Sequence, residues 1–323
     1  MWRCFVLLGW LVLFAQIGLA ADQPYPTKPI RVIVTQTTGS SMDVLTRMIT
    51  PKMTELLGQQ FVIDNRGGAG GMIGAQMGAR AVPDGYTLIF GGASSMIITT
   101  FSYKQVGFDP VKDYQAVSLV VEQEALLVVS PNLPVKSVKE LIALAKAQPG
   151  KLNMASAGIG SSGHLGGIMF TSMAGIDCAH VAYKGGGPMG FAVMGGEAQW
   201  AMALTATIMG HVKAGRLKAI AISSKQRSPL VPEYPTIDES GVPGYEFTTW
   251  NGFFFPKGTP QHYVMTMHAA IQKALASPQV KELYTVQGLI PLGSASPEEF
   301  GNYVRADFDR VGKLIKIAGI TPE

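Results

Sequence analysis

The segment IRVIVTQTTGSSMDVLTRMITPKMTELL, residues 30–57, decides the fold. Its first five residues are mostly β-branched and predict a buried strand, and the apolar residues after residue 41 recur at helical spacing. These strand and helix positions are Ile30, Val32, Ile33 and Val34, then Val44, Leu45, Met48, Ile49, Leu56 and Leu57. Ser41 or Asp43 is expected to cap the helix, because both side chains accept hydrogen bonds from first-turn amides.

Between the predicted strand and helix lies a short polar loop, which contains Gly39 and the hydroxyl residues Thr38, Ser40 and Ser41. A strand that enters a helix through such a loop directs backbone N–H groups and the positive end of the helix dipole toward one point. The loop therefore predicts an anion site, and we expect the anion to be a carboxylate.

The pattern of strand, loop and helix continues beyond this segment. Residues 61–65 predict a second strand, a glycine-rich stretch leads into a second helix, and residues 86–91 predict a third strand. This alternation favours a largely parallel sheet. A second polar loop, Gly91–Ser95 with Ala93 and Ser94, is expected at the same sheet edge, where open α/β sheets bind their ligands.

A second lobe is predicted in the middle of the chain. Two apolar runs within residues 115–130 indicate the crossing into it, and the aromatic segment YEFTTWNGFFFP at 245–256 indicates the return. Inside this lobe the strand KLNMASA opens into GIGSSGHL, which repeats the pattern of strand, Gly/Ser loop and helix start. Two such loops that face each other are predicted to hold the two ends of a small anion.

Composition narrows the class of protein. A chain of 323 residues exceeds one ordinary domain, which agrees with two lobes. The 26 Lys and Arg residues against 22 Asp and Glu leave a net charge of +4 that is spread along the chain. Nucleic-acid binders carry a basic stripe instead, so no nucleic-acid partner is expected.

The N-terminus predicts export. Residues 1–21 have the layout of a secretory signal peptide, with Arg3, an apolar run from Phe5 and small residues before a cleavage point near Ala20. A retained membrane anchor is the less favoured alternative, because the apolar run is shorter than the ~20 residues that a spanning helix needs. Cleavage leaves Cys178 as the only cysteine, so the protein is expected to fold without a disulfide.

Motifs for other chemistries are incomplete. GGAGGMIG has Ile73 where a dinucleotide fingerprint needs its third glycine, and no P-loop motif occurs. A hydrolase that uses Ser161 or Ser162 with His164 is an alternative that requires a hydrogen bond from serine to imidazole, although GIGSSG does not place serine as in G-x-S-x-G. The histidines lack ligand spacing, so no metal and no cofactor is expected.

A family resemblance is carried by segments that occur in order along the chain. They are TKPIRVIV, MDVLTRMITPKMTELLGQ, DNRGGAGGMIGA, PDGYTL, ASAGIGSSGHL, VAYKGGGP, HVKAGRLKAIAISS and SPLVPEYPTIDESGVPGYE. Together they resemble the Bug family, the TctC-like periplasmic substrate-binding proteins of tripartite tricarboxylate transporters. The resemblance implies a periplasmic α/β protein of two lobes, type II, with mainly parallel sheets, helices on both faces and two crossing segments as a hinge. It also implies a carboxylate held by backbone N–H groups of the first loop, often through bridging waters.

Two departures from the family pattern concern the ligand. Members usually carry an aromatic residue and a paired glycine in the first loop, where this chain has Gln36, Gly39 and Ser40, so a more polar wall is expected. Many members also carry an acid and an amide where this chain has Ala203 and Leu204. A ligand ammonium group would lack its partner without that acid, so an amino-acid ligand is not favoured.

These observations predict a monomeric receptor, not an enzyme. It would capture a small di-, tri- or aromatic carboxylate between its lobes and deliver it to the integral membrane permease subunits of a tripartite tricarboxylate transporter; a ligand sensor for a membrane signalling partner is the alternative. Residues 22–123 and 247–323 are assigned to the first lobe and 124–246 to the second. The expected ligand-binding residues are Gln36, Thr37, Thr38, Gly39, Ser40, Ser41, Ala93, Ser94, Ser161, Ser162, Gly163, His164, Tyr183, Lys184 and Thr205.

Overall fold

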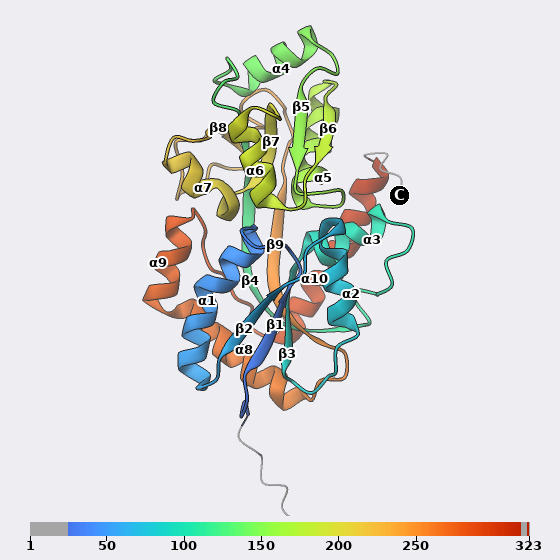
Figure 1. Ribbon diagram of the computed structural model, residues 1–323, viewed down its shortest axis with the longest axis vertical. Helices are drawn as coiled ribbons and strands as arrows, with labels where there is room; N and C mark the ends of the chain where they lie inside the picture. The colour runs from blue at the N-terminus through green and yellow to red at the C-terminus, as the bar shows by residue number, and fades with distance from the viewer. Residues whose placement is uncertain (1–24, 318–321, 323) are drawn as a thin grey trace, which may run out of the picture.

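The chain folds into two lobes that follow each other along its longest axis, and helices cover the sheet of each lobe (Figure 1). The computed structural model describes residues 25–317 and residue 322, so the predicted signal peptide lies outside the described residues. Among them, no helix combines the length and the apolar character that a bilayer span requires.

The first lobe is built on β1 (Ile30–Val34), which pairs in parallel with β2 (Phe61–Asn65) and β3 (Thr87–Gly92). On the far side of β3 the antiparallel strand β9 (Thr248–Pro256) follows. The strands predicted at 30–34 and 61–65 are therefore confirmed. The helices of this lobe are α1 (Ser41–Leu57), η1 (Ala69–Gly71), α2 (Met72–Ala79), η2 (Ser94–Ile98), α3 (Thr99–Ser102), α8 (Gln261–Ala276), α9 (Pro278–Val286) and α10 (Pro297–Ile317).

The second lobe is built on β5 (Asn153–Ser156), which pairs in parallel with β6 (Ala179–Ala182) and β7 (Trp200–Leu204). A further strand, β8 (Lys218–Ile222), is antiparallel to β4 (Tyr114–Val129), the strand that enters this lobe from the first lobe. Its helices are α4 (Val138–Ala147), α5 (Ser162–Ala174), α6 (Gly186–Gly195) and α7 (Thr205–Lys213). In both lobes the parallel strands therefore lie away from the crossing, and antiparallel pairs surround it.

One long strand, β4 (Tyr114–Val129), joins the lobes. It pairs with β9 through Glu124 and with β7 from Ala125 onward, so its partners change in the middle of the strand. The two apolar runs predicted to form the crossing belong to this single strand, and the return crossing predicted from the aromatic segment is β9. Green β4 and orange β9 run side by side between the lobes in Figure 1.

The inner strands of the sheet are buried on both faces, which explains their nearly continuous apolar runs. Successive side chains of a strand point to opposite faces. On β4, Leu126 and Val128 pack into the core under α6 and α7, whereas Leu127 and Val129 face the core that contains Trp200. The core that contains Trp200 is continuous between the lobes, because it also contains residues of β1, β3 and β9.

The prediction of a polar loop after β3 is wrong in part. Gly91 and Gly92 continue the strand by pairing with Gly252 and Asn251 of β9, and the π-helical turn η2 begins at Ser94. A Cβ atom on Gly92 would lie 2.4 Å from the Trp250 backbone carbonyl oxygen, so only glycine permits this pairing. The loop predicted at this edge is replaced by a helix start that directs Ser94 toward the second lobe.

The C-terminal helix α10 is held to the crossing strand by a buried polar contact. The Trp250 indole donates to Asp307 Oδ2 over 2.7 Å, and Asp307 Oδ1 pairs with Arg310. Around this contact α10 buries Phe300 and Val304.

We expect Asp307→Ala to lower the free energy of unfolding by about 2 kcal/mol, because it leaves the buried indole N–H without an acceptor. Asp307→Asn keeps an acceptor oxygen and should recover most of this loss. Urea unfolding of the three proteins measures the difference, and equal losses in the two variants would contradict the assignment.

Candidate functional site

The first helix start, between β1 and α1, is closed by its own side chains. Ser40 is the N-cap, with φ −73° and ψ 166°, and its Oγ accepts from the Asp43 amide at 3.3 Å. The N-cap of this helix was predicted at Ser41 or Asp43, and it lies instead at Ser40. Asp43 instead reaches backward, and its Oδ2 accepts from the Gly39 amide at 2.9 Å. Gly39 permits this turn because its φ is +78°.

The closed turn decides which amides remain for an anion. The Gly39 amide donates to Asp43 and the Ser40 amide to the Thr37 carbonyl. These two amides were expected to point toward an anion, and they are instead used within the turn. Within residues 25–317, the amides of Ser41 and Met42 donate to no protein acceptor. The buried Asp43 carboxylate is paired with Arg47 at 2.9 Å, which offsets its charge beside the helix start.

The second lobe repeats this helix start in detail. Gly160 has φ +75°, Ser161 is the N-cap with φ −73° and ψ 155°, and its Oγ accepts from the His164 amide at 3.2 Å. His164 stands where α1 has Asp43, and its Nδ1 accepts from the Gly160 amide at 3.4 Å. The predicted repetition of a Gly/Ser helix start is confirmed. The two starts differ in charge, because a histidine replaces the carboxylate.

His164 is held in its neutral form. The residue is 9% exposed, and its ring lies against the His180 ring, with 4.2 Å between the centroids and 31° between the ring planes. Burial, and then the neighbouring His180, lower the pKa of His164 from 6.5 to about 4. The neutral ring can therefore accept the Gly160 hydrogen bond at neutral pH.

A small inner cavity lies between the lobes, where the starts of α1, α5, α6 and α7 meet. Its lining consists of Gln36, Ser40, Ser41, Met42 and Ser94 from the first lobe and Ala157, Ser161, Ser162, Gly163, Gly186, Met189, Met202, Leu204 and Thr207 from the second. All of these residues are uncharged. Any field that favours an anion here must come from helix ends and hydroxyl groups.

An outer hollow lies beside the inner cavity and is also formed by both lobes. Its lining consists of Gln36, Thr37, Gly68, Ala69, Gly70, Tyr103, Ala157, Gly158, Ile159, Ala182, Tyr183, Lys184 and Gly185. Gln36 and Ala157 line both spaces, so the inner cavity and the outer hollow adjoin each other at these two residues. The outer hollow differs from the inner one because it contains aromatic rings and a lysine.

The predicted ligand-binding residues divide between these spaces. Gln36, Ser40, Ser41, Ser94, Ser161, Ser162 and Gly163 line the inner cavity, and Gln36, Thr37, Tyr183 and Lys184 line the outer hollow. Thr38, Gly39, Ala93, His164 and Thr205 line neither space. His164 turns toward His180, and Thr205 is fully buried at the start of α7. Ligand contact by each of the predicted residues stays a prediction.

Sequence reasoning missed several residues of the inner cavity, namely Met42, Ala157, Gly186, Met189, Met202, Leu204 and Thr207. Most are apolar residues that a pattern assigns to the core. Gly186 and Thr207 could have been found by extending the rule of helix starts to α6 and α7, since both lie within the first turn of their helix.

The lobes touch each other directly around these spaces. The Tyr103 hydroxyl donates to the Ile159 carbonyl at 3.2 Å, and the hydroxyls of Ser162 and Thr249 share a hydrogen bond of 3.0 Å. A Cβ atom on Gly185 of the second lobe would lie 2.0 Å from Thr37 Oγ1 of the first. The structure therefore shows the lobes closed on each other.

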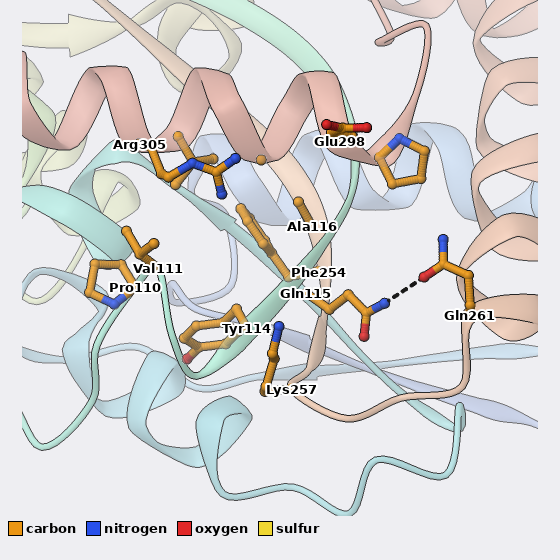
Figure 2. A pocket seen from close by; sticks show the side chains of 13 residues that line it. Pro110, Val111, Tyr114, Gln115, Ala116, Phe254, Lys257, Gln261, Glu298 and Arg305 are labelled. Atoms are coloured by element: carbon orange, nitrogen blue, oxygen red, sulfur yellow. Dashed lines mark hydrogen bonds between the residues drawn. The ribbon is translucent and has the colours of Figure 1, made fainter.

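A third hollow lies in the first lobe alone (Figure 2). Tyr114 and Phe254 form part of its wall, Lys257 and Arg305 extend toward it, and Gln115 donates to Gln261 over 2.9 Å at its edge. It does not include the predicted site residues. Because a single lobe forms it, a molecule bound there would not couple to the relative position of the lobes.

The hydrolase alternative lacks its geometry. Ser161 Oγ accepts a hydrogen bond from the His164 amide, and Nδ1 of the His164 ring accepts one from the Gly160 amide. These capping contacts replace the hydrogen bond from serine to the His164 imidazole that a hydrolase requires. Among the described residues, no cluster of three or more His, Cys, Asp or Glu side chains could hold a metal ion.

Two lobes joined by crossing strands, with an uncharged cavity between facing helix starts, define a two-lobe solute-binding protein of type II. The chain belongs to the tripartite tricarboxylate transporter family of receptors, whose family model matches residues 45–320. It is 31% identical to Protein BugT of Bordetella pertussis, over 99% of this chain and 98% of that protein. This is a family of substrate receptors and not of enzymes.

Solved structures agree with this assignment. R. palustris Rpa4515 with adipate has a TM-score of 0.90 at 33% identity, covering 93% of this chain and all of that one. MatC (Rpa3494) from Rhodopseudomonas palustris with bound malate has a TM-score of 0.85 at 29% identity, covering 90% of this chain and all of that one. The predicted α/β fold of two lobes is thereby confirmed.

Proposed function

We propose that this protein is an exported periplasmic receptor that captures a small carboxylate in the inner cavity and delivers it to membrane permease subunits. The observation that carries the proposal is the repeated Gly-Ser-Ser helix start, one copy from each lobe, on the two sides of one uncharged cavity. Membership of the receptor family and the adipate and malate bound by similar structures support it.

The two capping serines suit an anion better than a neutral ligand. Ser40 Oγ and Ser161 Oγ each accept a backbone hydrogen bond, which leaves each O–H group able to donate. A carboxylate has only acceptors and would take these O–H groups together with the amides of Ser41 and Met42. The absence of an acidic group among the lining residues removes repulsion, and it also leaves a ligand ammonium group without a partner.

Closure would couple capture to delivery. A ligand that touches both helix starts interacts with more groups in the closed form than in an open one, and this difference in affinity shifts the population toward the closed form. We assign residues 22–123 and 247–323 to the first lobe and residues 124–246 to the second. The change of β4 partners between Glu124 and Ala125 supports that boundary.

Calorimetric titration of the purified protein with succinate, adipate, citrate and benzoate tests the proposal. We expect at least one acid to bind and to raise the thermal midpoint, because a ligand that binds only the folded state stabilises it. The uncharged amide of the binding acid serves as the control and should bind much more weakly. Failure of every carboxylate to bind or to stabilise the protein would contradict the proposed function.

A further inference from the structure

The first serine of each Gly-Ser-Ser helix start caps its helix, and the second is hydrogen-bonded to a crossing strand. Ser41 Oγ accepts from Gln123 Nε2 of β4 at 3.4 Å. In the second lobe, the hydroxyl of Ser162 shares its 3.0 Å hydrogen bond with Thr249 of β9. Ser41 and Ser162 both line the inner cavity. The two contacts therefore connect both sides of the proposed ligand site to the strands that join the lobes.

The crossing strands also connect these two contacts to each other. Gln123 and Thr249 lie directly opposite in the register of the antiparallel pair β4 and β9, so their side chains leave the same face of the sheet. Gln123 Nε2 donates to Asn251 Oδ1 of β9 as well. These three residues are at most 4% exposed. A continuous set of buried polar residues therefore runs from one helix start to the other through the crossing strands.

The direction of these hydrogen bonds suits an anion. Gln123 Nε2 can only donate, so the Ser41 oxygen accepts and the Ser41 O–H group stays free to donate. The Thr249 hydroxyl can donate to Ser162 in the same way, which leaves the Ser162 O–H group free. The crossing strands can therefore present two further donors to a carboxylate in the cavity, one from each lobe.

The stability of the sheet alone does not account for a glutamine at position 123. Within residues 25–317, Gln123 Oε1 is a buried atom without a hydrogen-bond partner. Such an atom lowers stability, and an apolar side chain would avoid this cost. Gln123 is therefore better explained by its two donor contacts, to Ser41 and to Asn251, than by packing.

We infer that Gln123 and Thr249 are positioning residues, which fix the distance between the two helix starts at the value that a bound carboxylate requires. The inference rests on the proposed function and deepens it, because it assigns the ordering of the site to the crossing strands. Neither residue lines the inner cavity, so both act through the serines. Without these contacts fewer molecules hold the starts at the binding distance, and the apparent affinity falls with that fraction.

Thr249→Val keeps the shape of the side chain and removes its hydroxyl. Calorimetric titration with adipate should show about fivefold weaker binding than in wild type, which is the effect of one neutral hydrogen bond. Thr249→Ser keeps a hydroxyl and should restore the affinity to within about twofold. Gln123→Met removes the donor to Ser41 at a similar side-chain length and should also weaken binding about fivefold.

Thr259→Val is the matched control. This threonine is also 4% exposed, and its hydroxyl donates to the Pro256 carbonyl at 2.9 Å, outside both interlobe spaces. The control should lower the thermal midpoint about as much as Thr249→Val does, because it removes the same kind of buried hydrogen bond. Its affinity for adipate should stay within about twofold of wild type.

A measurement without ligand tests the distance itself. Spin labels on Glu55→Cys of α1 and Lys146→Cys of α4, two exposed positions, report the distance between the lobes by double electron-electron resonance. The native cysteines are replaced by alanine in this background. Thr249→Val should broaden the distribution of distances relative to the labelled parent protein, and Thr259→Val should leave it unchanged.

The outcomes separate this inference from the proposed function. A distance distribution that Thr249→Val does not alter would overturn the positioning role, whatever the affinities are. Equal losses of adipate affinity in Thr249→Val and Thr259→Val would also overturn it, because they would show a general effect of lower stability. Wild-type protein that binds no carboxylate would contradict the proposed function, and the distances measured without ligand would still decide whether Thr249 positions the helix starts.

Discussion

Ser40→Asp is expected to lower the affinity for the bound carboxylate about 1000-fold while the unliganded protein keeps its fold. The substitution places a fixed negative charge at the start of α1, on the wall of the inner cavity. Two like charges about 4 Å apart repel by roughly 4 kcal/mol at an effective dielectric constant near 20, which corresponds to about three orders of magnitude in the dissociation constant. Aspartate is itself a favourable N-cap, so α1 should still form.

Two further variants isolate the charge from the cap. Ser40→Ala removes the capping oxygen and should cost about 1 kcal/mol of stability with a much smaller effect on affinity. Ser277→Asp introduces the same charge at the N-cap of α9, whose serine also accepts a first-turn amide but lies outside both interlobe spaces. Calorimetry and thermal midpoints of all four proteins complete the test. If Ser40→Asp binds as tightly as wild type, the carboxylate does not lie at this loop.

Acidification from pH 6.5 to pH 4 is expected to remove about 3 kcal/mol of stability through His164 alone. Its pKa falls from 6.5 to about 4 on folding, so between these values the unfolded chain binds a proton that the folded protein excludes. The contribution is complete above pH 6.5 and is lost as the pH falls toward 4. Its size follows from about 1.4 kcal/mol for each pKa unit.

The His164→Asn variant measures this contribution. Its amide oxygen can still accept from the Gly160 amide, but it does not titrate, so the stability of the variant should change less between pH 6.5 and pH 4. His262→Asn, at an exposed histidine on α8, should follow the wild-type curve. Urea unfolding at half-unit intervals of pH gives the three curves. Parallel curves for wild type and His164→Asn would show that His164 does not titrate across this range.

The strands and helix starts could be predicted because local chemistry determines them. β1 and β2 lie on runs rich in β-branched and aromatic residues, and the serines at both Gly-Ser-Ser segments begin helices as hydroxyl caps do. Even here the sequence does not distinguish Ser40 from Ser41 as the cap. The choice depends on the backward reach of Asp43 to the Gly39 amide, which a pattern of residue types does not contain.

The far wall of the site was harder to predict, because it depends on which residues of different elements meet. Met42, Met189 and Met202 are ordinary core residues by pattern, and they line the cavity only because the lobes close over them. His164 was expected at the wall, yet its ring lies against His180, which is on strand β6. The extension of β3 through Gly92 likewise depends on β9, a strand far away in the sequence.

The position of β9 in the sheet also governs the order in which the lobes can be completed as the chain folds from its N-terminus onward. β9, residues 248–256, lies between β3 and β4 and hydrogen-bonds to both, so the first-lobe sheet has a gap until this strand joins it. By then β5 to β8 and the second half of β4 are already available to one another. Such pairing across a large sequence separation is slow to form. The lobe whose residues are made first is therefore the one that finishes folding last.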